Sequence, residues 1–247
     1  MPAASIHTAP SAPPAWLPGL LDDGFALVPD VVSRGRVDEL LAALDAPAEG
    51  DGVRRRENVY AIRNLLEAVP AVRELARSAA IRALVEPVLG AGAFAVRGIL
   101  FDKTPDANWK VTWHQDLTIA VRERIGVDGF GPWSEKAGIV HVQPPAKVLE
   151  RMVTVRLSLD PCGPGNGPVH VIPGSHRYGR LSAAEVQRWR TTHGAVATCL
   201  PAGGALLMRP LILHASSPST SPAHRRVVHL EFAADELPGW LAWHGRW

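Results

Sequence analysis

Apolar residues in the first ninety positions recur three and four places apart. In residues 36–44 the apolar side chains repeat at this helical spacing, and Ser33 stands before them as a candidate helix N-cap. Ser78 takes the same place before a later run that ends at Gly90, a residue type that commonly follows the last turn of a helix. The pattern predicts helices over residues 36–44, 60–69, 71–78 and 79–90, after a short strand in residues 24–31.

From about residue 95, apolar and polar residues alternate in short runs separated by Gly, Pro, Asn and Ser. Alternation is the period of a strand, and many short strands with turns between them are typical of a sandwich or barrel. The runs occupy residues 93–103, 109–116, 139–144, 152–160, 168–172, 194–200, 203–209 and 225–233. One helix is expected among them, over Ser182–Arg190, where Ser182 and Glu185 have the spacing of a capping box. Helices followed by strands predict an α+β fold with a mainly β core, in which the N-terminal helices pack on one sheet.

The two faces of the predicted strands differ in chemistry. In residues 225–232, Arg225, His229 and Glu231 share one face, and the other face is mostly apolar; residues 153–160 alternate in the same way. If water covers the polar faces, these are ordinary surface strands. If helices cover the apolar faces instead, the polar faces line an internal pocket, as a jelly roll with a polar site would require. The alternation is compatible with both arrangements.

Composition and charge narrow the class of protein. The chain of 247 residues is 47% hydrophobic and has a net charge of +2, which fits a globular domain and lacks the concentrated basic stripe of a nucleic-acid-binding protein. No apolar run reaches the length of about 18 residues that a membrane span needs, and the first residues lack the pattern of a secretion signal. Two isolated cysteines fit a reducing compartment. We expect a cytoplasmic protein without nucleic-acid or membrane partners, with a disordered tail over residues 1–15 and a single domain over residues 16–247.

One short segment, His114-Gln115-Asp116, carries the candidate chemistry. Side chains two positions apart on an extended segment project from the same side, with Cα atoms roughly 6–7 Å apart, so an imidazole and a carboxylate can converge on one ion. His214 lies far downstream, at the end of a second apolar, strand-like run. Two histidines and one carboxylate form the facial triad that holds non-haem Fe(II) and leaves one side of the metal open. Zinc or nickel can bind the same atoms, so the ligands alone leave the metal's identity open.

Further motifs surround these residues in a fixed order. Residues 165–168 have the sequence Gly-Asn-Gly-Pro, residues 171–176 have the sequence Val-Ile-Pro-Gly-Ser-His, and Arg225 follows His214 by eleven positions. This order of HxD, NG, PGSH, distal His and Arg resembles the phytanoyl-CoA dioxygenase family of Fe(II)- and 2-oxoglutarate-dependent oxygenases. The strand Leu100–Lys103 is also similar to the strand that leads to a lysine in that family. The resemblance extends over nearly the whole chain.

The resemblance implies a double-stranded β-helix, or cupin-like jelly roll, in which His114, Asp116 and His214 bind Fe(II) and are the catalytic residues. With Fe(II), 2-oxoglutarate and O₂, such an enzyme would hydroxylate a small organic molecule and decarboxylate 2-oxoglutarate to succinate and CO₂. Asp116 is intact, whereas halogenating relatives carry a small residue there, so hydroxylation is favoured. The alternatives are desaturation, epimerisation or cyclisation with the same cofactors, a non-catalytic jelly-roll protein that binds a small molecule, and a metalloenzyme that uses O₂ without a 2-oxo acid.

The same resemblance assigns residues to the cosubstrate 2-oxoglutarate. Arg225 would hold the far carboxylate, because a planar guanidinium grips it with two parallel hydrogen bonds, and Ser216 would hydrogen-bond the same group. Ile99 and Trp133 fall near positions that line the cosubstrate pocket in the family. Arg226 competes with Arg225, since one of two neighbours on a strand is exposed, and the spacing favours Arg225.

Several residues near the predicted strands have a structural and a functional interpretation. We interpret His141 and His176 as structural. His229 shares a strand face with Arg225, so a role in the pocket is the less favoured alternative to a structural role. Arg97 and Arg156 would either receive an anionic substrate or pair with neighbouring acidic residues. The glycine-rich segment 117–139 is expected to form a lid or pocket wall and to carry the specificity for the substrate. The sequence leaves the oligomeric state open.

Overall fold

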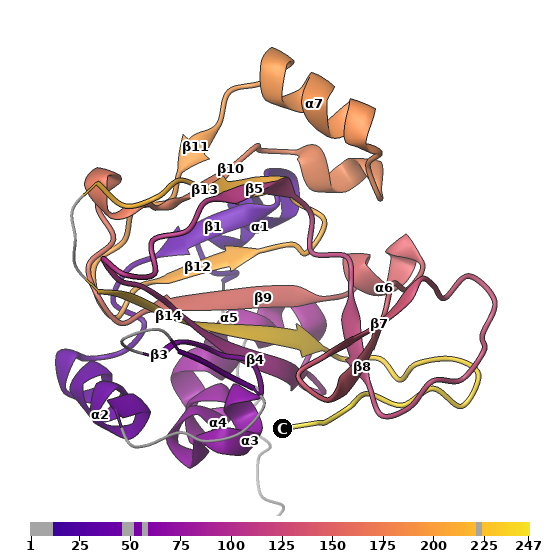
Figure 1. The fold of residues 1–247 in the computed structure, drawn as a ribbon, viewed down its shortest axis with the longest axis horizontal. Coiled ribbons are helices and arrows are strands. Elements are labelled where there is room, and N and C mark those ends of the chain that lie inside the picture. Colours follow the sequence, from indigo (N-terminus) through magenta and orange to yellow (C-terminus); the bar gives the residue numbers. More distant parts are fainter. Residues whose placement is uncertain (1–11, 46–51, 56–58, 221–223) are drawn as a thin grey trace, which may run out of the picture.

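The computed structural model describes residues 12–45, 52–55, 59–220 and 224–247 (Figure 1). The predicted disordered tail, residues 1–15, lies mostly outside the described residues and stays a prediction. Across the described parts of the chain, no helix is both long enough and apolar enough to cross a membrane.

Helices predominate in the first ninety residues, and strands make up most of the rest of the chain. The helices are α1 (Leu17–Asp22), α2 (Arg34–Asp45), α3 (Leu65–Ala68), α4 (Pro70–Arg77), α5 (Ala79–Leu89), α6 (Ala146–Glu150), the 3-10 turns η1 (Pro164–Asn166) and η2 (Ser175–Tyr178), and α7 (Ala183–Thr192). The strands are β1 (Phe25–Val28), β2 (Val53–Arg55), β3 (Val59–Ile62), β4 (Phe94–Lys103), β5 (Val111–His114), β6 (Ile119–Val121), β7 (Trp133–Lys136), β8 (Ile139–Val142), β9 (Val153–Ser158), β10 (Val169–Val171), β11 (Val196–Ala197), β12 (Ala205–Met208), β13 (His214–Ser216) and β14 (Arg225–Ala233).

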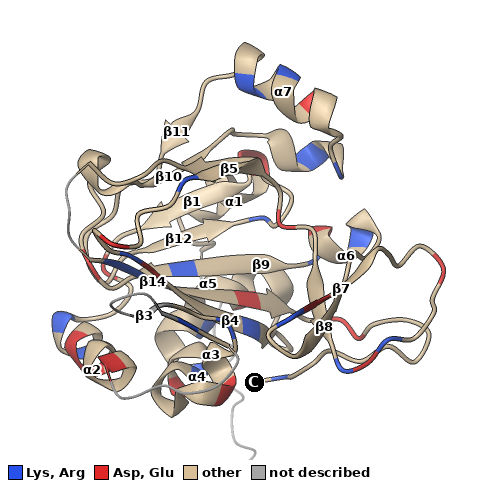
Figure 2. Ribbon diagram, in the orientation of Figure 1, with Lys and Arg blue, Asp and Glu red and all other residues tan. Residues whose placement is uncertain are grey.

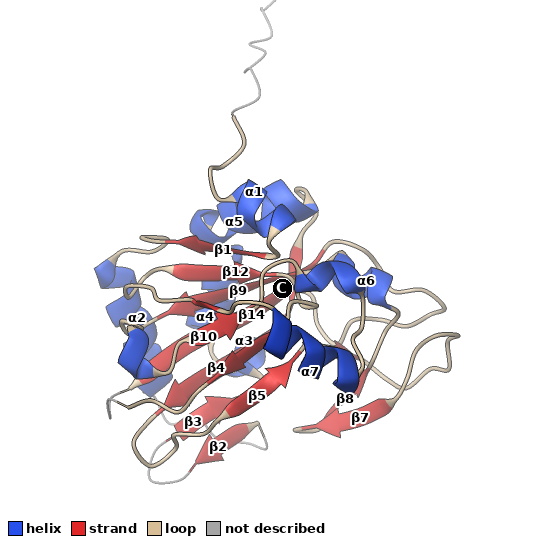
Figure 3. Ribbon diagram, turned by 90° about the horizontal axis from the view of Figure 1, so that it is seen from above, coloured by secondary structure: helices blue, strands red, loops and turns tan. Residues whose placement is uncertain are grey.

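Two antiparallel sheets face each other and confirm the predicted jelly roll. The large sheet has the strand order β1-β12-β9-β14-β4-β3-β2, and the small sheet has the order β11-β10-β13-β5. Figure 1 shows the small sheet above the large one, and Figure 3 shows the same layers from above. A third sheet, β6-β8-β7, stands at one end of the two layers.

Helices cover the outer face of the large sheet, so its polar face points inward. Val155 of β9 and Leu230 of β14 are fully buried in one apolar cluster with Leu75 of α4 and Ile81 of α5. Figure 1 shows α3, α4 and α5 on the side of this sheet that faces away from the small sheet. Of the two arrangements that the alternation allowed, the one with an internal polar pocket is confirmed.

The predicted helix over residues 60–69 is wrong in its first half. Residues 59–62 form β3, in which Ala61 and Ile62 pair with Phe101 and Leu100 of β4. Only Leu65–Ala68 is helical. The edge of the large sheet is available to this segment, and burial of Ile62 against it outweighs a helical pattern that is only about ten residues long.

The segment between Asp116 and Val140 contains strands that the sequence analysis did not predict. β6 and β7 pair with β8 from both sides, with Trp133 opposite Val142 and Lys136 opposite Ile139. This glycine-rich segment therefore forms a small sheet. The sheet lies beside the space between the two main sheets, in the place of a pocket wall (Figure 1).

Gly24, just before β1, packs against His176, the last residue of the PGSH motif. Its φ of +84° is in the left-handed region, and a methyl group there would overlap the imidazole of His176. Gly24→Ala is expected to lower the free energy of unfolding by about 2–4 kcal/mol, from backbone strain and overpacking together. Chemical denaturation measures this change. Gly35→Ala on α2, where nothing lies within 4 Å of the added methyl, is the control and should be neutral or slightly stabilising. Equal stability of the two variants would contradict this role of Gly24.

Candidate metal centre and its cavity

Three residues from two strands of the small sheet meet in the space between the sheets. His114 is the last residue of β5, His214 is the first residue of β13, and the two are paired across the sheet. Asp116 lies just beyond the end of β5, where its backbone N–H donates to the carbonyl of Pro210 at 2.9 Å. Pairing of β5 with β13 therefore brings together residues that are far apart in the sequence.

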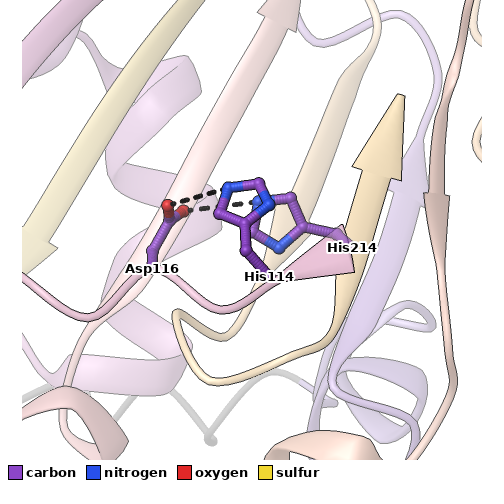
Figure 4. A group of neighbouring side chains, drawn as sticks. All are labelled: His114, Asp116 and His214. Carbon is purple, nitrogen blue, oxygen red and sulfur yellow. Dashed lines mark ion pairs between the residues drawn. The ribbon is translucent and has the colours of Figure 1, made fainter. Parts of the chain in front are cut away.

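The ligand atoms of this triad lie close enough to hold one metal ion. Nε2 of His114 is 3.8 Å from Oδ1 of Asp116, and Nε2 of His214 is 3.7 Å from Oδ2 of the same carboxylate (Figure 4). One ligand atom from each residue lies within 4.8 Å of the others. Oδ2 of Asp116 is buried and has no hydrogen-bond partner among the described atoms. A buried carboxylate oxygen without a donor is costly unless a cation faces it, which fits a metal site.

Both imidazoles are held so that Nε2 faces the shared centre. Nδ1 of His114 lies 2.8 Å from the carbonyl of Thr112, and Nδ1 of His214 lies 2.9 Å from the carbonyl of Ile212. A carbonyl only accepts, so Nδ1 carries the proton in both rings and Nε2 keeps its lone pair. Fixing the tautomer through the second ring nitrogen is the usual way in which proteins prepare histidine ligands.

Gln115, between two of the candidate ligands, orients both of them. Its side-chain amide donates to the carbonyls of Gly179 at 2.8 Å and Leu211 at 2.7 Å, and its oxygen accepts from the N–H of Leu181 at 2.8 Å. These bonds fix the backbone on either side of Gln115. Sequence analysis assigned no role to this residue; the only signal was its position in the middle of the HxD motif.

Burial and neighbouring charges put the triad in the protonation state that a metal requires. Burial lowers the pKa of His214 to about 4, so this imidazole is neutral at neutral pH. Burial alone would raise the pKa of Asp116, but its electrostatic interactions with the neighbouring imidazoles, that of His214 first, lower it to about 2. A neutral imidazole and an ionised carboxylate are the forms that bind metal.

A cavity of about 490 Å³ opens in front of the triad, between the two main sheets and beside the third. Its lining includes the triad and six other residues to which the sequence analysis assigned a possible role: Arg97, Ile99, Arg156, Ser216, Arg225 and His229. Trp133 is not among the described residues that line it. Trp133 packs against the apolar cluster of the third sheet. Lys136, an odd number of positions further along β7, lies on the opposite face and lines the cavity, as strand alternation requires.

Arg225 and its neighbour Arg226 have different surroundings. Arg225 is 3% exposed and lines the cavity, and its Nε has no hydrogen-bond partner among the described atoms. Arg226 is bound by Asp160, with Nε–Oδ2 and Nη2–Oδ1 distances of 2.9 and 2.8 Å. The geometry therefore leaves Arg225 as the guanidinium that can reach a ligand in the cavity.

The side chains of Arg225 and Ser216 converge on one acceptor. Nη1 of Arg225 donates to the carbonyl of Gly167, and Oγ of Ser216 donates to the same oxygen at 3.0 Å. Lys103, paired with Arg225 across β4 and β14, donates to Oγ of Ser216 at 2.7 Å. Burial, together with the charge of Arg225, lowers the pKa of Lys103 to about 8. Arg225 and Ser216 thus lie side by side at the cavity, and Nε of Arg225 remains the donor that a carboxylate could use.

A polar chain of side chains crosses the inner face of the large sheet. Nη1 of Arg156 donates to Nδ1 of His229 at 2.7 Å, so Nε2 of His229 carries the proton and donates to Glu231 at 3.2 Å. Nη1 of Arg97 donates to the same carboxylate oxygen of Glu231 at 3.1 Å. His229 lines the cavity, and its hydrogen bonds order this polar wall.

These residues fit a metal ion with a bidentate 2-oxo acid. Two histidines and one carboxylate leave coordination positions open on the cavity side. Arg225 offers a planar cation for the second carboxylate of a dicarboxylic acid. The donor set and the buried, unsatisfied oxygen of Asp116 are consistent with Fe(II), although the atoms alone also suit other divalent ions.

Comparison with known proteins gives one family and a set of similar folds. The model of the phytanoyl-CoA dioxygenase (PhyH) family matches residues 20–227. Among curated protein sequences, none is significantly similar to this chain.

Solved structures with the same fold include three that are informative about the arrangement. AviO1 from Streptomyces viridochromogenes Tue57 has a TM-score of 0.67 at 22% identity, covering 94% of this chain and 99% of its own. EctD from S. alaskensis, solved with 2-oxoglutarate and 5-hydroxyectoine, has a TM-score of 0.71 at 21% identity, covering 93% and 80%. The epimerase SnoN, solved with Fe³⁺, α-ketoglutarate and nogalamycin RO, has a TM-score of 0.64 at 18% identity, covering 91% and 90%. At these identities the similarity establishes the fold.

Proposed function

The chain belongs to the phytanoyl-CoA dioxygenase family of Fe(II)- and 2-oxoglutarate-dependent enzymes, and from this premise we propose that it hydroxylates a small organic molecule. The observation that carries the proposal is the convergence of His114, Asp116 and His214 in one cavity with Arg225. His114, Asp116 and His214 are the proposed iron ligands. Arg225 and Ser216 are the proposed partners of 2-oxoglutarate, and Ile99 lies on the same wall.

The chain's own residues bind, orient and exclude water in this reaction. O₂ would be the oxidant, activated by bound iron; 2-oxoglutarate would supply two electrons and take one oxygen atom as it leaves as succinate and CO₂, and the other oxygen atom would enter the substrate. Arg225, held by the carbonyl of Gly167, fixes the far carboxylate of the cosubstrate, so its reacting end can face the triad. The apolar side chains of Ile99 and Phe101 line the same cavity and limit the access of water.

Desaturation, epimerisation and cyclisation would use the same iron ligands and the same cosubstrate site. SnoN is an epimerase and EctD was solved with a hydroxylated compound, so one fold carries different outcomes. The outcome depends on which hydrogen of the substrate faces the triad. Asp116 keeps the carboxylate that halogenating relatives replace with a small residue, so hydroxylation is proposed over halogenation. A non-catalytic binding protein would not need three aligned ligands, and a metalloenzyme without a 2-oxo acid would not need Arg225.

The remaining features of the proposal concern organisation and location. Residues 16–247 are proposed to form one catalytic domain, since the cavity is lined by residues from β4 through β14. The substrate is proposed to be a small molecule that fits a cavity of about 490 Å³, in a cytoplasmic enzyme.

Anaerobic titration with Fe(II) and 2-oxoglutarate tests the proposal without knowledge of the substrate. The wild-type protein is expected to show the weak visible charge-transfer band of the iron–2-oxoglutarate chelate. His114→Ala is expected to abolish the band, because two ligands remain and the chelate is no longer held. Visible absorption spectra measure it.

A matched histidine provides the control for this titration. His170 of β10 lies in the same small sheet but lines a separate pocket, so His170→Ala should keep the band. Absence of the band in folded, iron-loaded wild type would rule out the dioxygenase function. Persistence of the band in His114→Ala would show that the ligands are assigned wrongly.

A further inference from the structure

Positive charge gathers at one end of the cavity, away from Arg225. Arg63, Arg97 and Lys136 all line the large cavity and a smaller cavity behind it. Arg97 pairs with Glu231, six positions along β14 from Arg225, which corresponds to roughly 20 Å of strand. The three cations therefore form a cluster separate from the proposed 2-oxoglutarate site.

Three different elements bring these cations together. Arg63 follows β3, Arg97 lies in β4 of the large sheet, and Lys136 ends β7 of the third sheet. Figure 2 shows charged positions on β4, β9 and β14 as well as on β7, along the walls of the space between the sheets. Nζ of Lys136 donates to Oγ1 of Thr118 at 2.9 Å, which aims the ammonium group at the cavity that both residues line.

Among the described residues, three carboxylates line these two cavities, and each already has a partner or a role. Glu231 accepts from Arg97 and from His229, and its side chain is 9% exposed. Glu67, in the smaller cavity, is bound by His244 at 2.6 Å. Asp116, the other carboxylate in the large cavity, belongs to the triad.

The cations also act on one another. The side chain of Arg97 is only 13% exposed, so water does not fully screen its charge. Burial lowers the pKa of Lys136, and the charges of Arg97 and Arg63 lower it further, against the smaller opposing effect of Glu231 and Asp116. Like charges held together at a half-buried site cost stability, and such sites recur where a ligand of opposite charge binds.

Building on the proposed function, we propose that the substrate carries an anionic oxygen group, a carboxylate or a phosphate, bound by Arg97, Lys136 and Arg63. The anion would be held at one end of the cavity and the 2-oxoglutarate at the other, with the triad between the two. The triad, Arg225 and these three cations all line the one large cavity. The third sheet, through Lys136, would then contribute to the choice of substrate.

Three phenyl compounds that differ in the charge of their polar group test this site; benzoate and benzamide also have nearly the same shape. Benzoate, phenyl phosphate and neutral benzamide are titrated by calorimetry into protein loaded anaerobically with Fe(II) and 2-oxoglutarate, so that Arg225 is occupied. At least one anion is expected to bind about ten-fold more tightly than benzamide, since a hydrogen bond to a charged group contributes about 1.5–3 kcal/mol. Comparison of the two anions distinguishes a carboxylate from a phosphate site.

Variants of the lysine distinguish a ligand site from a structural ion cluster. Lys136→Met should remove the preference for the anion and Lys136→Arg should keep it, whereas Lys147→Met on exposed α6 should not change it. The unfolding temperature of Lys136→Met should equal or exceed that of wild type, because a repelled cation is removed. The chelate band should be unchanged in Lys136→Met, so failure of the anion site and failure of the dioxygenase function give different results. Equal binding of all three probes, no binding of any probe, or a preserved preference in Lys136→Met would overturn the proposal.

Discussion

Asp116→Asn is expected to lower the affinity of the protein for Fe(II) by more than about 100-fold. Removing a group that only hydrogen-bonds to a metal ligand already lowers metal affinity by about 10–100-fold, and Asp116 is a proposed ligand itself. The substitution keeps the shape of the side chain and removes the one negative charge of the triad. Two neutral imidazoles then remain to hold a dication. Anaerobic equilibrium dialysis against Fe(II) measures the affinity, and loss of the chelate band should accompany its fall.

The metal-free variant is expected to stay folded. No hydrogen bond to Oδ2 of Asp116 is lost, and His214, with a pKa of about 4, carries no charge at neutral pH that the carboxylate would balance. Thermal unfolding followed by circular dichroism checks this point. Asp128→Asn, in an exposed loop of the same segment, is the control and should bind iron as wild type does. Iron binding by Asp116→Asn at wild-type affinity would exclude this carboxylate as a ligand.

The sequence predicted the triad more fully than its surroundings, for a physical reason. HxD and the distal His are recognisable because their spacing follows from side-chain direction and from an ordered set of motifs. The pairing of His114 with His214 depends on the register of β5 against β13, and no local sequence pattern specifies this register. The role of Gln115 likewise depends on Gly179 and Leu211, which are distant in sequence.

Strands with a strong alternation of apolar and polar residues were predictable from the sequence. Short strands that form only because a neighbouring strand offers its edge were not. β9 and β14 follow from their alternating residues, and their polar faces line the cavity as one of the two predicted arrangements required. β3 forms because β4 offers it an edge, and β7 forms because β8 does. The two residues expected to line the cosubstrate pocket differ for the same reason. Ile99 lies on the predicted strand β4, shares a face with Arg97 and lines the cavity. Trp133 lies on the unpredicted strand β7, on the face opposite to Lys136, and packs in the apolar cluster.

Arg225→Ala is expected to weaken the binding of 2-oxoglutarate by at least about 30-fold, because removing one partner of a buried charge pair costs about 2–5 kcal/mol. Iron binding itself should be retained, since the triad is untouched. Anaerobic titration of the iron-loaded variant with 2-oxoglutarate, followed through the chelate band, gives the dissociation constant. Arg225 contributes to the affinity for 2-oxoglutarate and does not touch the end of 2-oxoglutarate that binds iron. At a high concentration of 2-oxoglutarate the charge-transfer band should therefore return with the wild-type intensity.

Arg226→Ala is the matched control, because it removes the neighbouring guanidinium on the other face of β14. Arg226 is held by Asp160 through two hydrogen bonds, so its loss should reduce the free energy of unfolding and leave the dissociation constant of 2-oxoglutarate unchanged. Arg225→Lys should restore part of the affinity, since a point charge replaces the planar pair of donors. If Arg225→Ala and Arg226→Ala weakened 2-oxoglutarate equally, the effect would come from the strand as a whole and the assignment of Arg225 would fail. A difference confined to Arg225, with iron binding intact in both variants, follows only if this guanidinium meets the carboxylate.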